Sequence, residues 1–270
     1  MKGTFLLFKL AVKRARTLLL ATGLLLTAFQ VLLVLIAGSI KPSEFDQLAA
    51  LLPPFVRAIM GAAVASIMSF AGIVSIGYFD LAIVIALLAL TIAMATLPAS
   101  EIENGVVDLI LARPLPRHWV ITRTIAVVLF SITLMLGMMI AGTWIGLYTL
   151  APENAIWPTP YMIGMMALNL GMLMVCWSGV AMALGSVYRR SVASATTGLL
   201  ALLTLLLDIV AGIWTPAEHV AWLSPFHYFV PFDIVMGHEL YLENVVVLWA
   251  VGMTGYIVAY FLFSRRDISR

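Results

Sequence analysis

Long apolar runs dominate the chain and predict helices that cross a membrane. A helix needs roughly 17–25 apolar residues to cross about 30 Å of hydrocarbon. Six uncharged runs have this length, the fifth of them interrupted by Asp208: Thr17–Gly38, Leu81–Leu97, Thr124–Leu150, Tyr161–Val187, Ser191 to about Trp214, and Asn244–Ser264. Lipid offers the backbone no other local partner, so all six are expected to be α-helices. The pattern predicts an all-α polytopic membrane protein with one transmembrane domain over residues 1–270.

Composition agrees with this fold class and removes several classes of function. The 270 residues are 63% hydrophobic and 10% charged, with a mean hydropathy of +1.09. Soluble domains carry about 25% charged residues. The composition therefore excludes a soluble enzyme, a nucleic-acid-binding protein and a disordered chain. The single cysteine, Cys176, lies in an apolar run and excludes a disulfide framework, and no metal site is expected from the histidine spacing.

The distribution of basic residues predicts the orientation. With a cytoplasmic N-terminus, the cytoplasmic segments 1–16, 99–123, 188–190 and 265–270 hold 13 of the 15 Lys and Arg residues. This is the asymmetry that the positive-inside rule expects. A seventh apolar run, 58–79, would leave ten basic residues outside if it also spanned. We therefore expect six spans, both termini in the cytoplasm, and residues 58–79 as an extracytoplasmic interfacial helix or a re-entrant hairpin.

The segments between the spans receive separate predictions. Residues 1–16 place Lys2, Lys9, Lys13 and Arg16 on one helical face, which predicts an interfacial helix on the anionic cytoplasmic leaflet. A basic flank without a defined helix is the alternative. Residues 39–80 and 215–243 are expected to be extracytoplasmic, and the aromatic residues of the latter are typical of a membrane-interface belt.

The predicted cytoplasmic loop 99–123 contains a short helix signal. Ser100 and Glu103 have the spacing of a capping box, Gly105 permits a sharp turn, and Pro114 stops a helix. Between Gly105 and Pro114, the spacing i, i+3 and i+4 places three residues on one apolar helix face: Val106, Leu109 and Ile110. An apolar helix face in water needs a docking partner.

Three segments resemble the type-2 permease family of ATP-binding-cassette transporters. The acidic residues and glycine of 101–105, followed by an apolar helix ending in Leu-Ala-Arg-Pro-Leu-Pro-Arg at 111–117, resemble the family's coupling-helix loop. Residues 224–232 followed by Gly237 are similar to its loop before the last span. Residues 263–268, Phe-Ser-Arg-Arg-Asp-Ile, are similar to its C-terminal end. With the six spans in the same order, the resemblance covers nearly the whole chain.

The resemblance implies partners and roles. It implies a second permease subunit, identical or a sister copy, and a separate ATPase subunit that carries the ATP and magnesium. Glu101, Glu103 and Gly105 would shape the turn before the coupling helix. The side chains of the coupling helix that dock on the ATPase would be those of Val106, Leu109 and Ile110. The helix would end at Arg113, Pro114 and Arg117, which would contact the ATPase or lipid phosphates. The alternative for the arginines is that they only anchor the cytoplasmic side of the spans. The alternative for Glu101 and Glu103 is that they only stabilise the N-terminus of a helix through its dipole.

This chain lacks the means to hydrolyse ATP by the usual chemistry. A Walker A motif needs a Gly-Lys pair, and none occurs; all four lysines precede residue 42. We therefore expect no enzyme activity, catalytic residue or cofactor in this chain.

Polar residues within the spans are candidates for a substrate path. They are Gln30, Thr133, Thr143, Asn169 and Asp208, of which Asp208 is the only acid within a predicted apolar run. Each could instead bond between helices, and Asp208 could be solvated at the interface. The 15 methionines fit ordinary packing, a flexible apolar cavity or copper(I) binding.

The expected function follows from these observations together. We expect an exporter of an amphiphilic or lipid-like substrate in a bacterial or archaeal cytoplasmic membrane, with lipids as neighbours and no nucleic-acid partner. One alternative is an ATP-driven machine that acts on an extracytoplasmic partner, for example in copper-related maturation. Another is a stand-alone membrane enzyme or carrier, which would need more ionisable groups within the spans.

Overall fold

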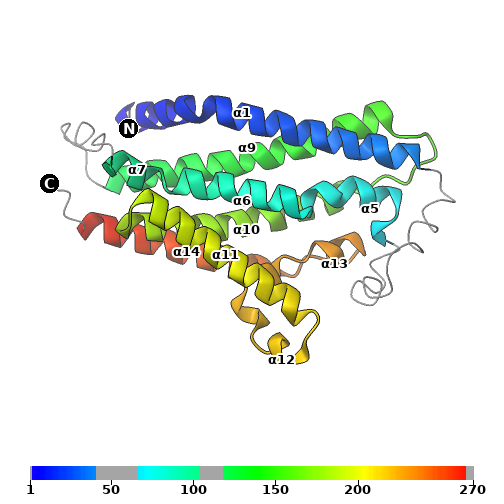
Figure 1. Cartoon of the computed structure of the whole chain (residues 1–270). Coiled ribbons are helices and arrows are strands. Elements are labelled where there is room, and N and C mark those ends of the chain that lie inside the picture. The colour runs from blue at the N-terminus through cyan, green and yellow to red at the C-terminus, as the bar shows by residue number, and fades with distance from the viewer. Residues whose placement is uncertain (1, 41–65, 104–117, 266–270) are drawn as a thin grey trace.

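The computed structural model describes residues 2–40, 66–103 and 118–265, and Figure 1 shows them as an elongated helical bundle. No β-strand occurs among these residues. Within the described ranges, six helical segments are long and apolar enough to cross a membrane: Ala11–Ser39, Phe70–Ala95, Trp119–Leu150, Pro160–Val187, Arg190–Ala211 and Leu242–Phe263. The predicted fold class and number of spans are therefore confirmed.

The two ends of the bundle differ in what they carry. The start of the first helix and the end of the last lie at the same end, together with α7, and we call this the terminal end (Figure 1). We call the other side the distal end: α5 (Phe70–Ser75) lies at its tip, α13 (Pro231–Val235) lies nearer the middle, and α12 (Thr215–Glu218) protrudes from the side of the bundle (Figure 1). Both described chain ends thus lie at the same end of the bundle, and their cytoplasmic placement stays a prediction.

The first helix is longer than expected. α1 runs from Lys2 to Ser39 without interruption, so residues 2–16 continue directly into the first span. The basic face of residues 1–16 instead predicts a separate interfacial helix. No proline or glycine lies between Gly3 and Gly23, so nothing in the sequence stops the helix at residue 16.

The second span begins earlier than predicted and is broken. It consists of α5 (Phe70–Ser75), the 3-10 helix η1 (Ile76–Tyr78) and α6 (Leu81–Ala95). Asp80 restarts the helix, because its Oδ1 accepts the backbone N–H groups of Ala82 at 3.0 Å and Ile83 at 3.2 Å. Asp80 thus lies within a candidate span, which corrects the expectation that Asp208 is the only such acid.

Residues 66–79, the described part of the seventh apolar run, pack inside the protein. In a small cluster at the distal end, Val74 of α5 is fully buried with Val34 of α1 and Leu147 of α9. The Gly, Ala and Ser residues of segment 66–79 suit this position, because small residues let neighbouring helices approach closely.

Two helix pairs form the tightest contacts of the bundle. α9 (His118–Leu150) packs along α1, and a Cβ added at Gly142 would lie 2.7 Å from the carbonyl oxygen of Thr27. α10 (Pro160–Val187) packs along α14 (Leu242–Arg265), where a Cβ at Gly179 would lie 2.2 Å from the carbonyl oxygen of Gly252. Only glycine permits backbones this close.

α10 forms the centre of the bundle and α11 (Arg190–Ala211) its edge. Seventeen of the 28 residues of α10 are buried, Cys176 among them. Three of the 22 residues of α11 are buried, and all three are small: Ala193, Thr197 and Ala201. The leucines of α11 mostly face outward, where lipid would cover them.

The chain between α11 and α14 folds into short helices at the distal end. They are α12 (Thr215–Glu218), η2 (Ala221–Leu223), η3 (Pro225–Tyr228) and α13 (Pro231–Val235). Gly237 follows α13 with a φ of +88°, a backbone conformation that L side chains rarely adopt. The glycine therefore permits the turn that leads into α14.

Candidate functional site

The predicted coupling loop begins with α7 (Leu97–Glu103), which follows α6 after the single residue Thr96. Pro98 lies in the first turn of α7, where a missing N–H costs little, and α6 ends before it as predicted. The rest of the predicted coupling helix falls at 104–117, outside the described residues. Seven coupling residues therefore keep the status of predictions: Gly105, Val106, Leu109, Ile110, Arg113, Pro114 and Arg117.

A buried ion pair joins the two described ends of this loop. Arg123, near the start of α9, donates from Nη2 to Oε2 of Glu101 in α7. The side chains are 5% and 13% exposed, respectively. The Nε of Arg123 has no partner among the described residues. A buried charge is stable only when it is paired, so this contact fixes α7 against α9.

A second acidic residue of α7 binds the start of α11. Oε1 of Glu103 accepts the backbone N–H of Arg190 at 2.7 Å. The guanidinium of Arg190 also donates from Nη1 to Oγ of Ser100 at 3.4 Å. A carboxylate at a helix N-terminus satisfies a free N–H group and interacts favourably with the helix dipole. We call these contacts and the Glu101–Arg123 pair the terminal clasp.

The predicted capping box of Ser100 and Glu103 is wrong. α7 already begins at Leu97, so Ser100 lies inside the helix and its N–H reaches the carbonyl of Thr96 at 3.4 Å. Glu103 instead caps another helix, α11. Sequence spacing identified a capping carboxylate but could not identify the helix that it caps.

Two of the five predicted path residues meet near the 3-10 break of the second span. Oγ1 of Thr143 lies 3.0 Å from the hydroxyl of Tyr78. Gln30 is fully buried, and a Cβ added at Gly77 would come within 2.4 Å of its Nε2. Neither polar atom of the Gln30 amide has a hydrogen-bond partner among the described residues. The third candidate on these helices, Thr133, is exposed on α9.

Asn169 is fully buried in α10 and holds the distal chain in place. Its Nδ2 donates to the carbonyl of Tyr228, and its Oδ1 accepts the N–H of Val230, both at 3.0 Å. Both polar atoms of the amide are thus used within the protein. The structure gives Asn169 a positioning role between α10 and the segment after η3.

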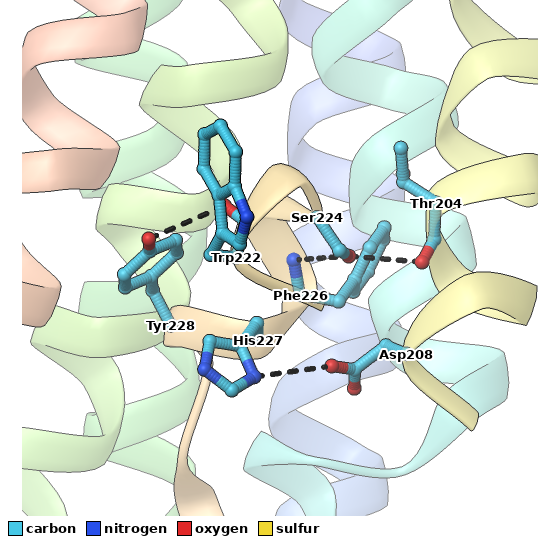
Figure 2. A network of polar contacts seen from close by, with 7 residues as sticks. All are labelled: Thr204, Asp208, Trp222, Ser224, Phe226, His227 and Tyr228. Carbon is cyan, nitrogen blue, oxygen red and sulfur yellow. Dashed lines mark hydrogen bonds and ion pairs between the residues drawn. The ribbon is translucent and has the colours of Figure 1, made fainter. Parts of the chain in front are cut away.

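Asp208, the fifth candidate, belongs to a polar network that joins α11 to η2 and η3 (Figure 2). Its Oδ1 lies 3.8 Å from Nδ1 of His227. Ser224 donates to the carbonyl of Thr204 at 2.8 Å and accepts the N–H of Phe226 at 3.1 Å (Figure 2). These contacts attach the distal chain to the last turns of α11.

A hollow of about 520 Å³ opens beside this network. Three carboxylates line it, from Asp208, Glu218 and Asp233, together with the imidazole of His227. Phe226, Phe229 and Phe232 also line it. From the sequence, Asp208 alone of this set is a candidate site residue, because the spacing of His227, Glu218 and Asp233 predicts no metal site and the aromatic residues are typical of an interface belt. No group of three His, Cys, Asp or Glu side chains in the described part of the chain could hold a metal ion.

A second cavity adjoins the hollow. It is a groove of about 180 Å³ between α6 and α11, lined by apolar side chains and by Gly198. Phe226 lines both cavities and is 5% exposed. Nothing in the local sequence indicates this groove, because it forms where two separate spans pack loosely.

Comparison with known proteins adds no relative: neither a protein-family model nor a curated protein matches this chain.

Proposed function

We propose that this chain is the membrane-spanning permease subunit of an ATP-binding-cassette transporter that exports an amphiphilic substrate. In this proposal two permease subunits, identical or sister copies, pair with two separate ATPase subunits. The ATPases dock on residues 104–117 at the terminal end. The observation that carries the proposal is the terminal clasp, which bonds both described ends of that loop to the bundle.

The contacts of the clasp support a coupling role. A displacement of residues 104–117 acts on α7 and on the start of α9, which the Glu101–Arg123 ion pair keeps together. Glu103 extends the connection to the first residue of α11. One loop thus reaches three spans. Binding of ATP to the closed ATPase pair would favour one arrangement of these spans over the other, which is how a ligand shifts a conformational equilibrium.

Charge supports the orientation that docking requires. Every Lys and Arg among the described residues lies toward the terminal end: Lys2, Lys9, Lys13, Arg14, Arg16, Arg123, Arg189, Arg190 and Arg265. The described distal end instead carries six acids, Glu153, Asp208, Glu218, Asp233, Glu239 and Glu243, and a seventh, Asp80, lies within the second span. Basic residues favour the cytoplasmic side, so the terminal end would face the cytoplasm, where ATP is available.

A pull-down from native membranes tests the docking site. The tagged chain is expected to recover a protein with a Walker A motif, identified by mass spectrometry. Replacing two of the predicted docking residues (Leu109→Asp with Ile110→Asp) should abolish that recovery. Ile156→Asp is the matched control, because Ile156 is 83% exposed in the distal loop between α9 and α10.

Each outcome decides a part of the proposal. Equal recovery with the double variant would exclude Leu109 and Ile110 as the docking face. Absence of any ATPase from the wild-type sample would overturn the permease assignment in favour of a stand-alone membrane protein.

Cysteine labelling tests the orientation separately. Cys176 is fully buried and is replaced first, so that Asp108→Cys and Glu218→Cys each supply a single reactive thiol. A membrane-impermeant maleimide added to intact cells should label the variant at position 218 and leave the one at 108 unlabelled. The reverse pattern would overturn the orientation.

A further inference from the structure

The groove between α6 and α11 has the shape and lining of a site for an alkyl chain. Its α6 wall extends from Leu81 to Ile92, about 16 Å at the helical rise of 1.5 Å per residue. Its α11 wall contains Gly198 and Leu202. A Cβ added at Gly198 would meet no atom within 4 Å, so the space beside this glycine is open. No charged side chain lines the groove.

Phe226 joins this groove to the acidic hollow. Phe226 lines both cavities, and its ring packs against that of Trp177 in α10, with ring centroids 6.0 Å apart. The N–H of Phe226 is held by Ser224, which also binds the carbonyl of Thr204 in α11. The groove and the hollow thus adjoin at Phe226, whose backbone position is fixed by Ser224.

The hollow favours a cationic group. Asp208, Glu218 and Asp233 supply three carboxylates, against the single imidazole of His227. Among the described residues no Lys or Arg lies at this end of the bundle. Carboxylates would attract a cation, and the faces of aromatic rings bind organic cations through their quadrupole. Phe229 and Phe232 provide such rings in the same hollow.

We infer that the groove and the hollow together form one binding site for a lipophilic organic cation. The alkyl chain lies between α6 and α11, and the cationic head lies among Asp208, Asp233 and the phenylalanine rings. That this cation is the transported substrate rests on the proposed function, whereas binding of the cation to the site requires no ATPase.

Equilibrium binding to the purified chain in nanodiscs of zwitterionic lipid tests the site. The probes are radiolabelled dodecyltriphenylphosphonium and methyltriphenylphosphonium, which share a head and differ in the chain. Tetraphenylborate supplies an anion of nearly the same shape. After subtraction of the signal from empty discs, both cations should bind and the anion should not.

Substitutions separate the two parts of the site. Asp208→Asn with Asp233→Asn should weaken binding of both cations about tenfold, the sum of two partly screened charge interactions. Gly198→Leu should weaken binding of the dodecyl cation alone, because the new side chain fills the groove. Gly164→Leu is the control: a Cβ there also meets no atom within 4 Å, and Gly164 does not line the groove.

The result can overturn either part. Equal binding of tetraphenylborate, or affinity unchanged in the Asn variants, would exclude the cationic head group. Unchanged dodecyl affinity in Gly198→Leu would exclude the groove. Size-exclusion profiles identify any variant that fails to fold, and Glu218→Gln, at an exposed residue that also lines the hollow, then replaces the Asn pair. Cation binding without recovery of an ATPase would overturn the proposed transporter function alone. Recovery of an ATPase without cation binding would overturn the cation site alone.

Discussion

α10 and α11 follow each other in the chain, have nearly equal hydropathy and occupy opposite environments. Only Tyr188 and Arg189 separate them. Seventeen of the 28 residues of α10 are buried, against three of the 22 residues of α11. Hydropathy therefore identifies a span but not its place in the bundle. The place depends on where small residues allow another backbone to approach, as Gly179 does in α10.

The two helices are also held by different forces. α10 packs along α14 through backbone contact at Gly179, Gly252 and Gly255. α11 is attached by polar contacts near its two ends: to Glu103 at its start, to Thr96 through Ser194 at 3.2 Å, and to Ser224 and His227 near its end. Dispersion forces over a long contact stabilise α10, whereas a few hydrogen bonds position α11.

The largest expected effect comes from separating α10 from α14. In Gly179→Leu the new side chain would overlap the carbonyl oxygen of Gly252, because even a Cβ lies 2.2 Å from it. We expect a loss of about 3 kcal/mol or more in the free energy of unfolding, measured by circular dichroism during denaturation in detergent. Gly164→Leu in the same helix should unfold like the wild type. Equal stability of both variants would show that α10 and α14 do not approach this closely.

A smaller effect is expected at the start of α11. Glu103→Gln replaces the carboxylate that accepts the N–H of Arg190 and weakens the cap by about 1 kcal/mol. Hydrogen exchange followed by mass spectrometry should show faster exchange in the first turn of α11, with α10 unchanged. Equally increased exchange in α10 would mean that the two helices open as one unit.

The smallest effect is expected at the distal end of α11. Asp208→Asn removes a partly exposed pair with a nitrogen–oxygen distance of 3.8 Å, so the free energy of unfolding should change by less than about 0.5 kcal/mol. Added salt should reduce even this difference, because it screens exposed charges. A larger, salt-independent loss in the same denaturation assay would contradict the weak attachment of α11.

Much of the fold could be predicted from the sequence because membrane helices depend on local composition. Five of the six predicted spans begin within six residues of the segments in the structure. The second begins 11 residues earlier, because Asp80 caps a helix restart in the middle of the span rather than marking its outer boundary. A capping residue and a boundary residue look the same in one sequence.

The candidate site was harder to predict because its contacts join distant segments. Glu103 binds a residue 87 positions away, and Asn169 binds backbone groups 59 and 61 positions away. The sequence makes Asn169 a candidate substrate ligand, because every polar side chain within a span is such a candidate. The groove depends on how loosely α6 and α11 pack, which periodicity does not describe.

α11 extends from the terminal clasp to the hollow, so a tilt of this helix would couple the two. Its small buried residues centre on Thr197, about 10 Å along the helix from Arg190 and about 16 Å from Asp208. If α11 tilts about this contact, a movement of 1 Å at Arg190 becomes about 1.6 Å at Asp208, in the opposite direction. Asn169 fixes the chain after η3 to α10, so the tilt would move the α11 wall of the hollow, and Ser224 and His227 with it, relative to that chain. Because the contact at Thr197 lies nearer to Arg190 than to Asp208, a small displacement at the start of α11 would produce a larger one at the hollow.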